Sequence, residues 1–483
     1  MKQRWYGLNR EGAGCMEKIV IFGASGGALK VAHTLQNLNI DFEYFVDNDK
    51  NKWDKQLEGK LIKNPEVLKD TDERILIASD YQSEIEEQLA EWGILERLIL
   101  KEECIFQYFE KNQEAYVKHY NPNQKQSNSD KKNIIVELAD AGICLGGIET
   151  WAMMVTRDFR KRGYPTELWL RKQQQDIPEE LKEAVVEIDY DYSRYKESIE
   201  ETVKMLIEKL PCTVISNWQS QVMVAAILVK RMYPEQIKII SVIHNDKKVL
   251  YRRQKYMEKD TDIIFGVSRK ICQTFITEYG IDKNKVIYKE SPVRCVDFEK
   301  KYTLSQAEPV KIGYAARITK YQKRADLLVE LVNKINKMNL NVEFEIAGDG
   351  NYFERFKRDI DLSKGNVKVL GNLPREKMQA FWRDKDIFIN ISDFEGVGLS
   401  MLEAMSNGVV PIETDVAGAD EFIKNGVNGY YVSIGDVEGM IAKIKLLVDD
   451  RNKMESMGRI SREIVKEKCN EEDYIDVLES LIL

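Results

Sequence analysis

Short apolar runs alternate with longer stretches of helical pattern along most of the chain. Each apolar run predicts a buried strand, and apolar residues at helical spacing between the runs predict helices. Strands that alternate with helices indicate parallel, doubly wound α/β sheets. The predicted strands are Ile19–Phe22, Phe42–Val46, Ile75–Ala78, Asn133–Leu138, Glu167–Leu170, Val185–Ile188, Thr213–Asn217, Ile237–Ile243, Ile263–Val267, Val310–Tyr314, Glu343–Ala347, Val367–Leu370, Ile387–Ile391 and Val409–Glu413.

The stretch Asp393–Pro411 carries the strongest chemical signal. Glu395 stands just before the loop Gly396-Val397-Gly398, and Leu399–Met405 follows with a composition that favours a helix. We expect this helix to begin at Ser400 or just before it. Glycine lets the backbone approach a ligand closely, and the first helical turn leaves N–H groups unpaired. Such a helix start suits a phosphate group.

A second carboxylate lies one helical turn inside this helix. Glu403 and Glu395 bracket the anion site, which suits hydroxyl groups on either side of a diphosphate. Their spacing (403 − 395 = 8) resembles that of the retaining glycosyltransferases of family 4, which have the GT-B fold. The resemblance implies that Glu395 contacts the donor sugar and Glu403 the ribose hydroxyls. It also implies donor contacts at Gly396, Val397, Gly398 and Leu399. A solvated helix start is the alternative for an isolated glutamate pair.

Cations after the strand Val310–Tyr314 extend the resemblance. The family carries an arginine at this strand end and a lysine at the spacing of Arg317 and Lys323 (323 − 317 = 6). A diphosphate leaving group gains negative charge as the glycosidic bond breaks, and fixed cations can stabilise it without a metal ion. Lys320 and Arg324 are the alternatives for this role.

Two further turns resemble the nucleotide site of the family. Gly348 and Gly350 form a G-x-G turn that stands beside the nucleotide in the family. The turn at Leu373 matches the one that holds the base through backbone groups. Ala417 departs from the pattern, because the family more usually has a second glycine there, and backbone contact at this position stays open.

Residues 132–305 resemble the acceptor-side domain of the family. The glycine pair Gly146 and Gly147 precedes a helix predicted from Thr150 to about Arg162. The resemblance implies that this loop faces the cleft near the diphosphate and the acceptor. A tight turn without a ligand is the alternative.

His244 follows the predicted strand Ile237–Ile243, and ligands collect at the carboxyl ends of strands in parallel sheets. A histidine at this place in the family contacts the donor sugar, which we prefer to a structural role. The basic, aromatic segment 247–256 comes next. It suits a lipid-diphosphate acceptor or an anionic membrane surface, or it forms a solvated helix face.

Residues 16–118 open with a strand, a glycine turn and a helix. Gly23, Gly26 and Gly27 form a G-x-x-G-G turn, and Asp47 ends the second strand, where a bound dinucleotide places a ribose. The segment resembles small Rossmann-like domains attached to bacterial enzymes of surface-polysaccharide assembly. A structural or partner-binding role and a nucleotide site at these residues both stay open.

Composition narrows the class of protein. A chain of 483 residues predicts several domains, and a net charge of −8 argues against a nucleic-acid partner held by overall positive charge. The 7 cysteines contain no C-x-x-C pair, so we expect reduced thiols and no structural zinc. No apolar run reaches the ~20 residues of a membrane span, and the N-terminal residues lack the apolar core of a signal peptide. We expect a cytoplasmic protein, with peripheral contact at the inner membrane face as an option.

The expected organisation is three Rossmann-like α/β domains, two of which form the GT-B fold. The accessory domain spans 16–118, after an extension at 1–15, and a polar linker spans 119–131. The acceptor-side domain spans 132–305, the donor-side domain spans 306–464, and the final helix, 465–483, packs back on the acceptor side.

The sequence thus predicts a retaining glycosyltransferase that uses a nucleoside diphosphate sugar, with UDP as first choice, and a carbohydrate or lipid-linked acceptor. Bacterial surface-polysaccharide or glycoconjugate synthesis is the expected setting. No cofactor or metal ion is expected, because Arg317 and Lys323 supply the charge. The alternative is a non-catalytic glycosyltransferase-like subunit that binds a protein partner through residues 16–118.

Overall fold

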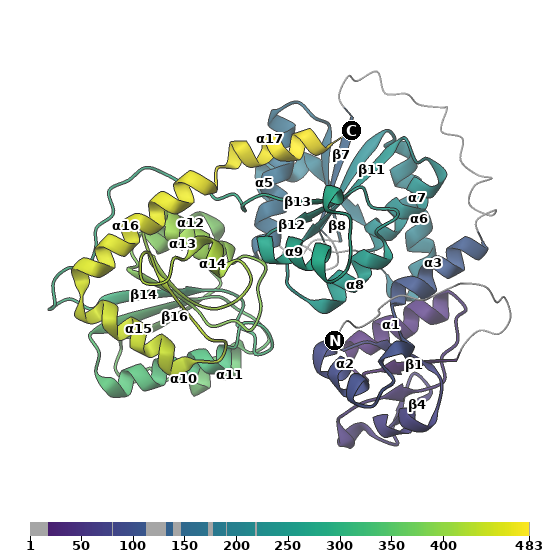
Figure 1. Cartoon of the computed structure of the whole chain (residues 1–483), viewed down its shortest axis with the longest axis horizontal. Helices are drawn as coiled ribbons and strands as arrows, with labels where there is room; N and C mark the ends of the chain where they lie inside the picture. The colour runs from purple at the N-terminus through teal and green to yellow at the C-terminus, as the bar shows by residue number, and fades with distance from the viewer. Residues whose placement is uncertain are drawn as a thin grey trace. The chain divides into compact units, whose positions relative to one another are not determined.

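The structure is a computed structural model that describes residues 18–79, 81–112, 132–138, 146–171, 177–189, 191–217 and 220–482. The predicted extension at 1–15, the linker at 119–131 and the residues 141–145 ahead of Gly146 lie outside the described residues. The chain divides into two compact units, one within residues 1–113 with 191–197 and the other within 114–190 with 198–483. Figure 1 shows the helices and strands that make up each unit.

The first unit is built on one sheet with strand order β3-β4-β2-β1-β5-β6, in which β3 is antiparallel to β4 and the other pairs are parallel. Both faces are covered, because Ile21 of β1 packs in one apolar cluster and its neighbour Phe22 in another. The elements are β1 (Ile19–Phe22), α1 (Gly26–Asn37), β2 (Phe45–Val46), β3 (Gln56–Leu57), β4 (Lys60–Lys63), β5 (Arg74–Ile77), α2 (Gln82–Glu91), β6 (Leu98–Ile99) and α3 (Lys101–Lys111).

The strand predicted at Phe42–Val46 is shorter in the structure. The regular ladder of β2 covers Phe45–Val46, although Glu43 N–H already donates to Ile19 O at 2.8 Å. The chain therefore runs beside β1 before it enters the ladder.

The second unit contains two sheets, which we call the β7 half and the β14 half. The β7 half has the order β13-β12-β11-β10-β7-β8-β9, and its neighbouring strands are parallel. Its elements are β7 (Asn133–Glu137), α5 (Gly147–Lys161), β8 (Thr166–Arg171), β9 (Val185–Ile188), α6 (Tyr195–Glu208, from residue 198 on), β10 (Cys212–Ser216), α7 (Gln221–Met232), β11 (Ile237–Ile243), α8 (Lys248–Tyr256), β12 (Ile263–Gly266), α9 (Arg269–Thr277) and β13 (Val286–Tyr288).

The β14 half has the parallel order β16-β15-β14-β17-β18-β19. Its elements are β14 (Val310–Ala315), α10 (Ala325–Met338), β15 (Val342–Ala347), α11 (Phe353–Asp359), β16 (Val367–Gly371), α12 (Arg375–Arg383), β17 (Ile387–Asn390), α13 (Leu399–Ser406), β18 (Val410–Thr414), α14 (Ala419–Phe422), β19 (Tyr430–Val432), α15 (Val437–Asp449) and α16 (Arg451–Lys468). The last helix of the chain is α17 (Glu471–Leu481).

Each half has a point at which the order of strands reverses. The chain passes from β14 outward through β15, and then returns to the other side of β14 at β17; β7 and β10 have the same relation. Doubly wound sheets bind ligands at the carboxyl ends of the strands beside such a switch point. We therefore expect ligand-binding residues in the loops after β14 and β17 and in those after β7 and β10.

The chain returns to the β7 half at its last helix. Val465 and Cys469 still pack in the core of the β14 half, whereas Tyr474 of α17 packs in that of the β7 half. Tyr474 OH accepts a 2.8 Å hydrogen bond from the buried Trp151 Nε1 of α5, and Figure 1 shows the two helices alongside. The return therefore begins after residue 469.

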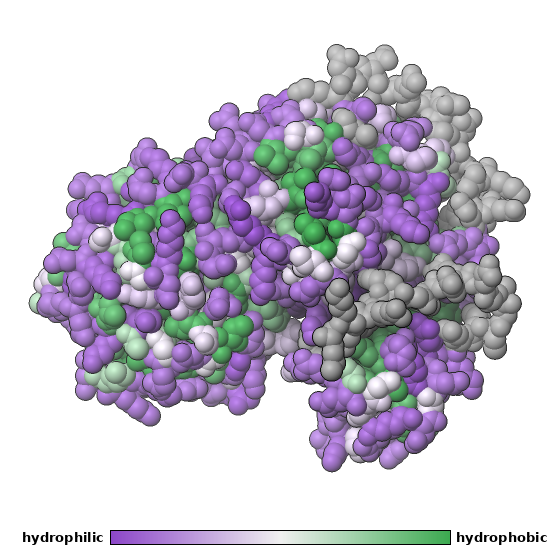
Figure 2. All heavy atoms as spheres, viewed as in Figure 1, coloured by the Kyte–Doolittle hydropathy of each residue, from purple (hydrophilic) through white to green (hydrophobic). Residues whose placement is uncertain are grey.

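The face of the molecule in Figure 2 is largely hydrophilic, and its hydrophobic residues form small separate areas. Within the residues that the structure describes, no helix combines the length and apolar composition needed to cross a bilayer.

The substitution Tyr474→Phe should lower the free energy of unfolding by about 1–3 kcal/mol, because it leaves the buried Trp151 N–H without its acceptor. The urea midpoint followed by tryptophan fluorescence measures this loss. Ser480→Ala is the matched control on the same helix, since its exposed hydroxyl bonds only to Val477 O at 2.6 Å. Equal midpoints for the two variants would contradict the role assigned to this hydrogen bond.

Candidate active site

An ion pair joins the loops that follow β14 and β17. Lys323 Nζ lies 2.5 Å from Glu395 Oε1, and both side chains are largely shielded from solvent. The structure therefore brings together two predicted residues that lie 72 positions apart in the sequence. Because these loops flank the switch point of the β14 half, the pair stands where such sheets bind ligands.

Gln322 connects this ion pair to Arg317. Its Nε2 donates to Phe394 O at 3.1 Å, and its Oε1 accepts a bond from Arg317 Nη2 at 3.3 Å. The Arg317 side chain is exposed, so its charge is accessible to a ligand. Sequence reasoning missed Gln322, because a single glutamine has no motif spacing that marks it.

The two alternative cations differ in their surroundings. Arg324 Nη1 lies 2.9 Å from Asp393 Oδ1, and its Nε lies 3.2 Å from Asp326 Oδ1, so two carboxylates offset its charge. Lys320 is exposed, and none of the ion pairs among the described residues involves it. The geometry therefore favours Arg317 and Lys323 over Arg324 as the cations for a diphosphate. Lys320 is a further exposed cation on the same loop.

The loop after β17 lies directly against the end of β11 in the β7 half. A Cβ on Gly396 would lie 2.0 Å from His244 O, a distance that real Cβ atoms do not show, so glycine is required here. Beside it, Asp246 N–H donates to Glu395 O at 3.3 Å. Glu395 and His244, both predicted as catalytic, therefore lie in adjoining loops.

Helix α5 starts earlier than predicted. Gly147 is its first residue and Gly146 its N-cap, in place of a start at Thr150. A Cβ on Gly147 would lie 3.0 Å from the Cδ1 of Leu399, so the glycine makes room for α13 of the other half.

Glu149, one turn into α5, is buried and was not singled out from the sequence. Burial raises the pKa of its carboxyl, while its own backbone N–H and the charge of Arg317 oppose the rise. The α5 start therefore lies within electrostatic reach of the predicted diphosphate cation.

The predicted glycine turn after β15 supports the loop that carries Arg317. Gly348 has φ +139°, and a Cβ there would lie 1.9 Å from Ala316 O; a Cβ on Gly350 would lie 2.6 Å from Ile318 O. These glycines are thus needed for contact between two backbone segments. Leu373 is partly buried against the apolar cluster around α13.

The start of α13 is close to the prediction. Gly398 is the N-cap and Leu399 the first helical residue, while Val397 packs against the cores of both halves. Behind the loop, a Cβ on Gly418 would lie 2.8 Å from Gly396 O, whereas the adjacent Ala417 is buried. The atypical alanine therefore sits in the interior, next to the glycine that meets the loop.

A buried carboxyl group lies beneath this loop. Glu413 ends β18, is 0% exposed, and accepts a 2.5 Å hydrogen bond at Oε1 from Asn390 Nδ2; its Oε2 has no partner among the described residues. Burial raises the pKa of Glu413 to about 8, with Glu395 adding to the rise and Asn390 and Lys323 opposing it. Glu413 is therefore neutral at pH 7. The sequence offered no signal for it beyond its place at a strand end.

Glu403 lies on α13, apart from the Lys323–Glu395 pair. Burial raises the pKa of its carboxyl, and the nearby positive charge of Arg375 opposes the rise. The described residues include no ion pair to Glu403. The charge of Arg375 on α12 thus acts on the Glu403 carboxyl without an ion pair between the two side chains among the described residues.

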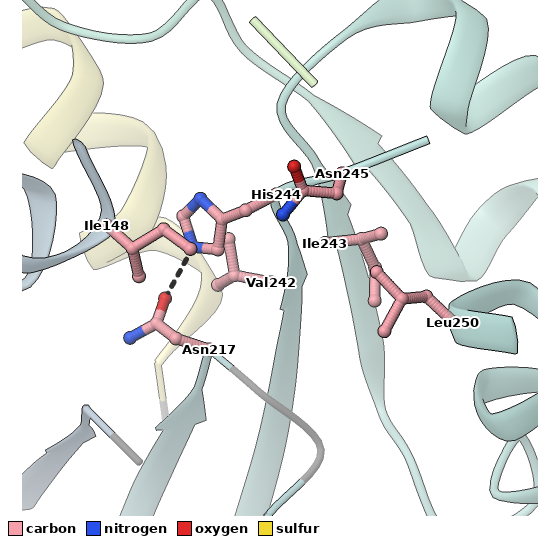
Figure 3. Close-up of a pocket in the computed structure, with 7 residues that line it drawn as sticks. All are labelled: Ile148, Asn217, Val242, Ile243, His244, Asn245 and Leu250. Atoms are coloured by element: carbon pink, nitrogen blue, oxygen red, sulfur yellow. Dashed lines mark hydrogen bonds between the residues drawn. The ribbon is translucent and has the colours of Figure 1, made fainter. Parts of the chain in front are cut away.

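His244 faces a small pocket in the β7 half (Figure 3). The pocket is lined by Ile148, Asn217, Val242, Ile243, His244, Asn245 and Leu250. His244 Nε2 lies 2.7 Å from Asn217 Oδ1. The Trp151 and His244 rings pack edge to face, with 5.5 Å between their centroids. Burial lowers the pKa of His244 to about 3, so the ring is neutral and cannot act as a cation.

The basic segment after His244 is largely engaged within the protein. Lys247 Nζ lies 4.4 Å from the centre of the Phe394 ring, Tyr251 is buried, and Lys255 pairs with Glu258 at 2.6 Å. Lys247 thus reaches toward the loop that holds Glu395.

The carboxylate of Asp47 in the first unit is occupied by the protein. Its Oδ2 accepts bonds from Ala24 N–H at 2.8 Å and Lys52 Nζ at 3.0 Å, and its Oδ1 accepts one from Asp49 N–H at 2.8 Å. Asp47, which we predicted to bind the ribose of a nucleotide, therefore accepts a hydrogen bond from the glycine turn instead.

The glycines of this turn differ in their surroundings. Gly23 has φ +117°, and a Cβ there would lie 2.7 Å from Ala78 O; a Cβ on Gly27 would lie 3.3 Å from the same atom. Gly26 borders open space. No group of three or more metal-ligating side chains occurs in the part of the chain that the structure describes.

Two family models match the chain. Residues 296–464 match the model "Glycosyl transferases group 1", and residues 15–100 match "C2185-like, N-terminal". The N-acetyl-alpha-D-glucosaminyl L-malate synthase of Bacillus anthracis is 23% identical over 277 residues, which are 53% of this chain and 71% of the relative. The poly(ribitol-phosphate) alpha-N-acetylglucosaminyltransferase of Staphylococcus aureus is 28% identical over 166 residues, which are 34% of each chain.

Solved structures share the fold. Anabaena Alr3699/HepE in complex with UDP and glucose has a TM-score of 0.60 at 15% identity, covering 72% of this chain and 100% of that one. A mutant of S. aureus TarM in complex with Fondaparinux, alpha-GlcNAc-glycerol and UDP has a TM-score of 0.51 at 15% identity, covering 96% of this chain and 99% of that one. The predicted GT-B fold is confirmed, and the group 1 match supports a GT-B glycosyltransferase.

Gly396→Ala should separate the loop after β17 from the end of β11, because the added methyl group cannot occupy a position 2.0 Å from His244 O. We expect faster hydrogen exchange at the Asp246 N–H, which donates to Glu395 O. Gly26→Ala is the control, since nothing lies within 4 Å of its Cβ position. Unchanged exchange in Gly396→Ala would show that the loop tolerates the side chain.

Glu413→Gln should flatten the pH dependence of stability. The native pKa of about 8 exceeds the ordinary 4.5, so between these values the folded state binds a proton that the unfolded state has released. Stability from this group is therefore greatest at low pH and falls as pH rises through the window. Urea midpoints across the window should decline less in the glutamine variant. Parallel curves for variant and wild type would refute a neutral Glu413.

Proposed function

We propose that this protein is a retaining glycosyltransferase of family 4 that moves a sugar from a nucleoside diphosphate to a carbohydrate or lipid-linked acceptor. The observation that carries the proposal is the 2.5 Å Lys323–Glu395 ion pair at the switch point of the β14 half, with Arg317 exposed beside it. A carboxylate for sugar hydroxyls and two cations for phosphate oxygens are thereby grouped at one place.

The charges suit a diphosphate leaving group. Arg317 is accessible to phosphate oxygens, and Glu395 holds Lys323 in position before a ligand arrives. Preorganised cations stabilise charge that develops in the transition state without the cost of reorientation. Each charge-assisted contact contributes about 1.5–3 kcal/mol. We therefore propose that turnover needs no metal ion.

A front-face reaction, in which the acceptor attacks from the side of the leaving group, needs no covalent nucleophile, and this agrees with the surroundings of the two nearby carboxyl groups. Glu395 is paired with Lys323 and Glu413 is enclosed and neutral, so neither is free to act as a covalent nucleophile. In the proposed step, the bond between the anomeric carbon and the phosphate oxygen breaks as the acceptor oxygen bonds to the same face. The acceptor proton passes to the departing phosphate oxygen, and the enzyme contributes position and charge.

The activities in the names of the relatives guide the choice of donor. Both relatives described above are named for N-acetylglucosaminyl transfer, and the two structural neighbours contain UDP. UDP-N-acetylglucosamine is therefore the first donor to test. We propose bacterial surface-polysaccharide or glycoconjugate synthesis as the setting, at the inner face of the membrane when the acceptor is lipid-linked.

For the first unit we propose a structural or partner-binding role. Both oxygens of Asp47 already accept bonds from the protein, so a nucleotide would have to displace Lys52 or the Ala24 N–H. A partner surface requires no such rearrangement.

A donor screen tests the function. With chelator present, a UDP-sugar at one hundred times its dissociation constant should stabilise the wild type by about 2.7 kcal/mol, which raises the melting temperature by several degrees. Glu403→Ala should lose the shift and Arg317→Ala should reduce it. Lys320→Ala is the comparison variant, because it removes the other exposed cation of this loop without breaking an ion pair; loss of the shift in this variant and not in Arg317→Ala would transfer the phosphate contact to Lys320.

The anomeric configuration of the product, read by NMR with any acceptor that is turned over, tests retention. An inverted product would overturn the mechanism. If no nucleoside diphosphate sugar shifts the wild type, the protein is better described as a non-catalytic glycosyltransferase-like subunit.

A further inference from the structure

A chain of hydrogen bonds leads from Glu137 to His244, and its links between Glu137 and Asn217 are buried. Glu137 is 0% exposed at the end of β7, where its carboxylate accepts bonds from Ser216 Oγ at 2.9 Å, Asn217 N–H at 3.0 Å and Ser220 Oγ at 2.8 Å. Asn217 Nδ2 then donates to the backbone oxygen of Glu137 at 2.6 Å, and Asn217 Oδ1 lies 2.7 Å from His244 Nε2. These residues lie at the ends of β7, β10 and β11 or in the loops that follow them, and the three strands are neighbours in the sheet.

This chain fixes which way the Asn217 amide points. A backbone carbonyl oxygen can only accept a hydrogen bond, so the group that faces Glu137 O must be the NH₂ of Asn217. The opposite end of the amide, Oδ1, therefore faces the imidazole. The assignment follows from donor and acceptor chemistry, so it does not depend on telling amide nitrogen from oxygen by position.

The orientation of the amide determines the tautomer of His244. Because Asn217 Oδ1 can only accept, the hydrogen bond requires a proton on Nε2. Burial keeps the pKa of the ring near 3, so the second nitrogen, Nδ1, is unprotonated and carries a lone pair. Figure 3 shows this nitrogen on the side of the ring away from Asn217, and no hydrogen bond to it is present within the described ranges.

We propose that Asn217 is a positioning residue that holds His244 as the Nε2–H tautomer, so that Nδ1 accepts a hydrogen bond from a hydroxyl or amide N–H of the substrate. The substrate part of this inference rests on the proposed function. His244 is placed for it, since its backbone oxygen meets Gly396 in the loop that carries Glu395. The group opposite Nδ1 must be a donor, which excludes a carboxylate or phosphate oxygen there.

The tautomer can be measured on the full-length protein without any activity. The chain contains 3 histidines, so a two-bond ¹H–¹⁵N correlation spectrum of ¹⁵N-histidine-labelled protein is simple, and His244→Gln identifies the signal. We expect wild-type His244 to show the Nε2–H pattern without titration near neutral pH. Asn217→Ala should give mixed tautomers or a titrating ring. An Nδ1–H pattern in the wild type, or an unchanged pattern in Asn217→Ala, would overturn the proposal.

Asn245→Ala is the matched control for the spectrum. Asn245 lines the same pocket and follows His244 directly, but it makes no hydrogen bond to the imidazole. We expect this variant to keep the wild-type tautomer. If it disturbs the tautomer as strongly as Asn217→Ala does, general loosening of the pocket explains the effect and the positioning role is refuted.

Spectra recorded with added ligand test the contact at His244 Nδ1. UDP-N-acetylglucosamine should move the Nδ1 resonance in the direction expected for a nitrogen that accepts a hydrogen bond, and UDP alone should not. Asn217→Ala should lower kcat/KM about tenfold, the effect of one lost hydrogen bond. A bound sugar nucleotide that leaves Nδ1 unmoved would overturn the substrate contact. Failure of every donor to bind would instead count against the proposed function, and the ligand-free spectrum would still decide the role of Asn217.

Discussion

The close approach of the loop after β17 to the end of β11 is the constraint on which the candidate active site depends. Gly396 meets His244 O on one side, and Gly418 meets Gly396 O on the other, at distances that exclude a side chain at either glycine. Because backbone lies against backbone, no change of rotamer can relax the contact. The ion pair of Glu395 and the pocket beside His244 are thereby held in adjoining loops.

Charge is distributed around this contact in a way that follows from burial. An ionised carboxylate is tolerated away from water when a cation lies against it, and Glu395 has Lys323 at 2.5 Å. Glu413 is fully buried, and its carboxyl accepts a hydrogen bond at one oxygen from the Asn390 amide, so it remains neutral. A second buried negative charge is thus avoided, and Arg317 keeps an accessible positive charge that suits an anionic ligand.

The first unit also has a glycine turn between a strand and a helix, but its acidic residue is bonded within the protein and is not available to a ligand. It too has a strand, a glycine turn and a helix, with an acidic residue at the end of the neighbouring strand. There, however, Asp47 bonds to Ala24 N–H and to Lys52, so the carboxylate stabilises the turn. The second unit leaves its exposed cation available, and this difference is why we place the chemistry in the second unit.

The sequence by itself determined the α/β class, the places of the strands along the chain and the positions of Arg317, Lys323, Glu395 and Glu403, because periodicity and spacing are local properties of the chain. Tertiary structure decided what surrounds these residues. It placed Gln322 between Arg317 and the Glu395 loop, set Glu413 beneath that loop, and turned the predicted glycines toward backbone atoms. It also placed Asn217 against His244. These contacts join loops after different strands, so they depend on strand order and sheet packing, which no local spacing encodes.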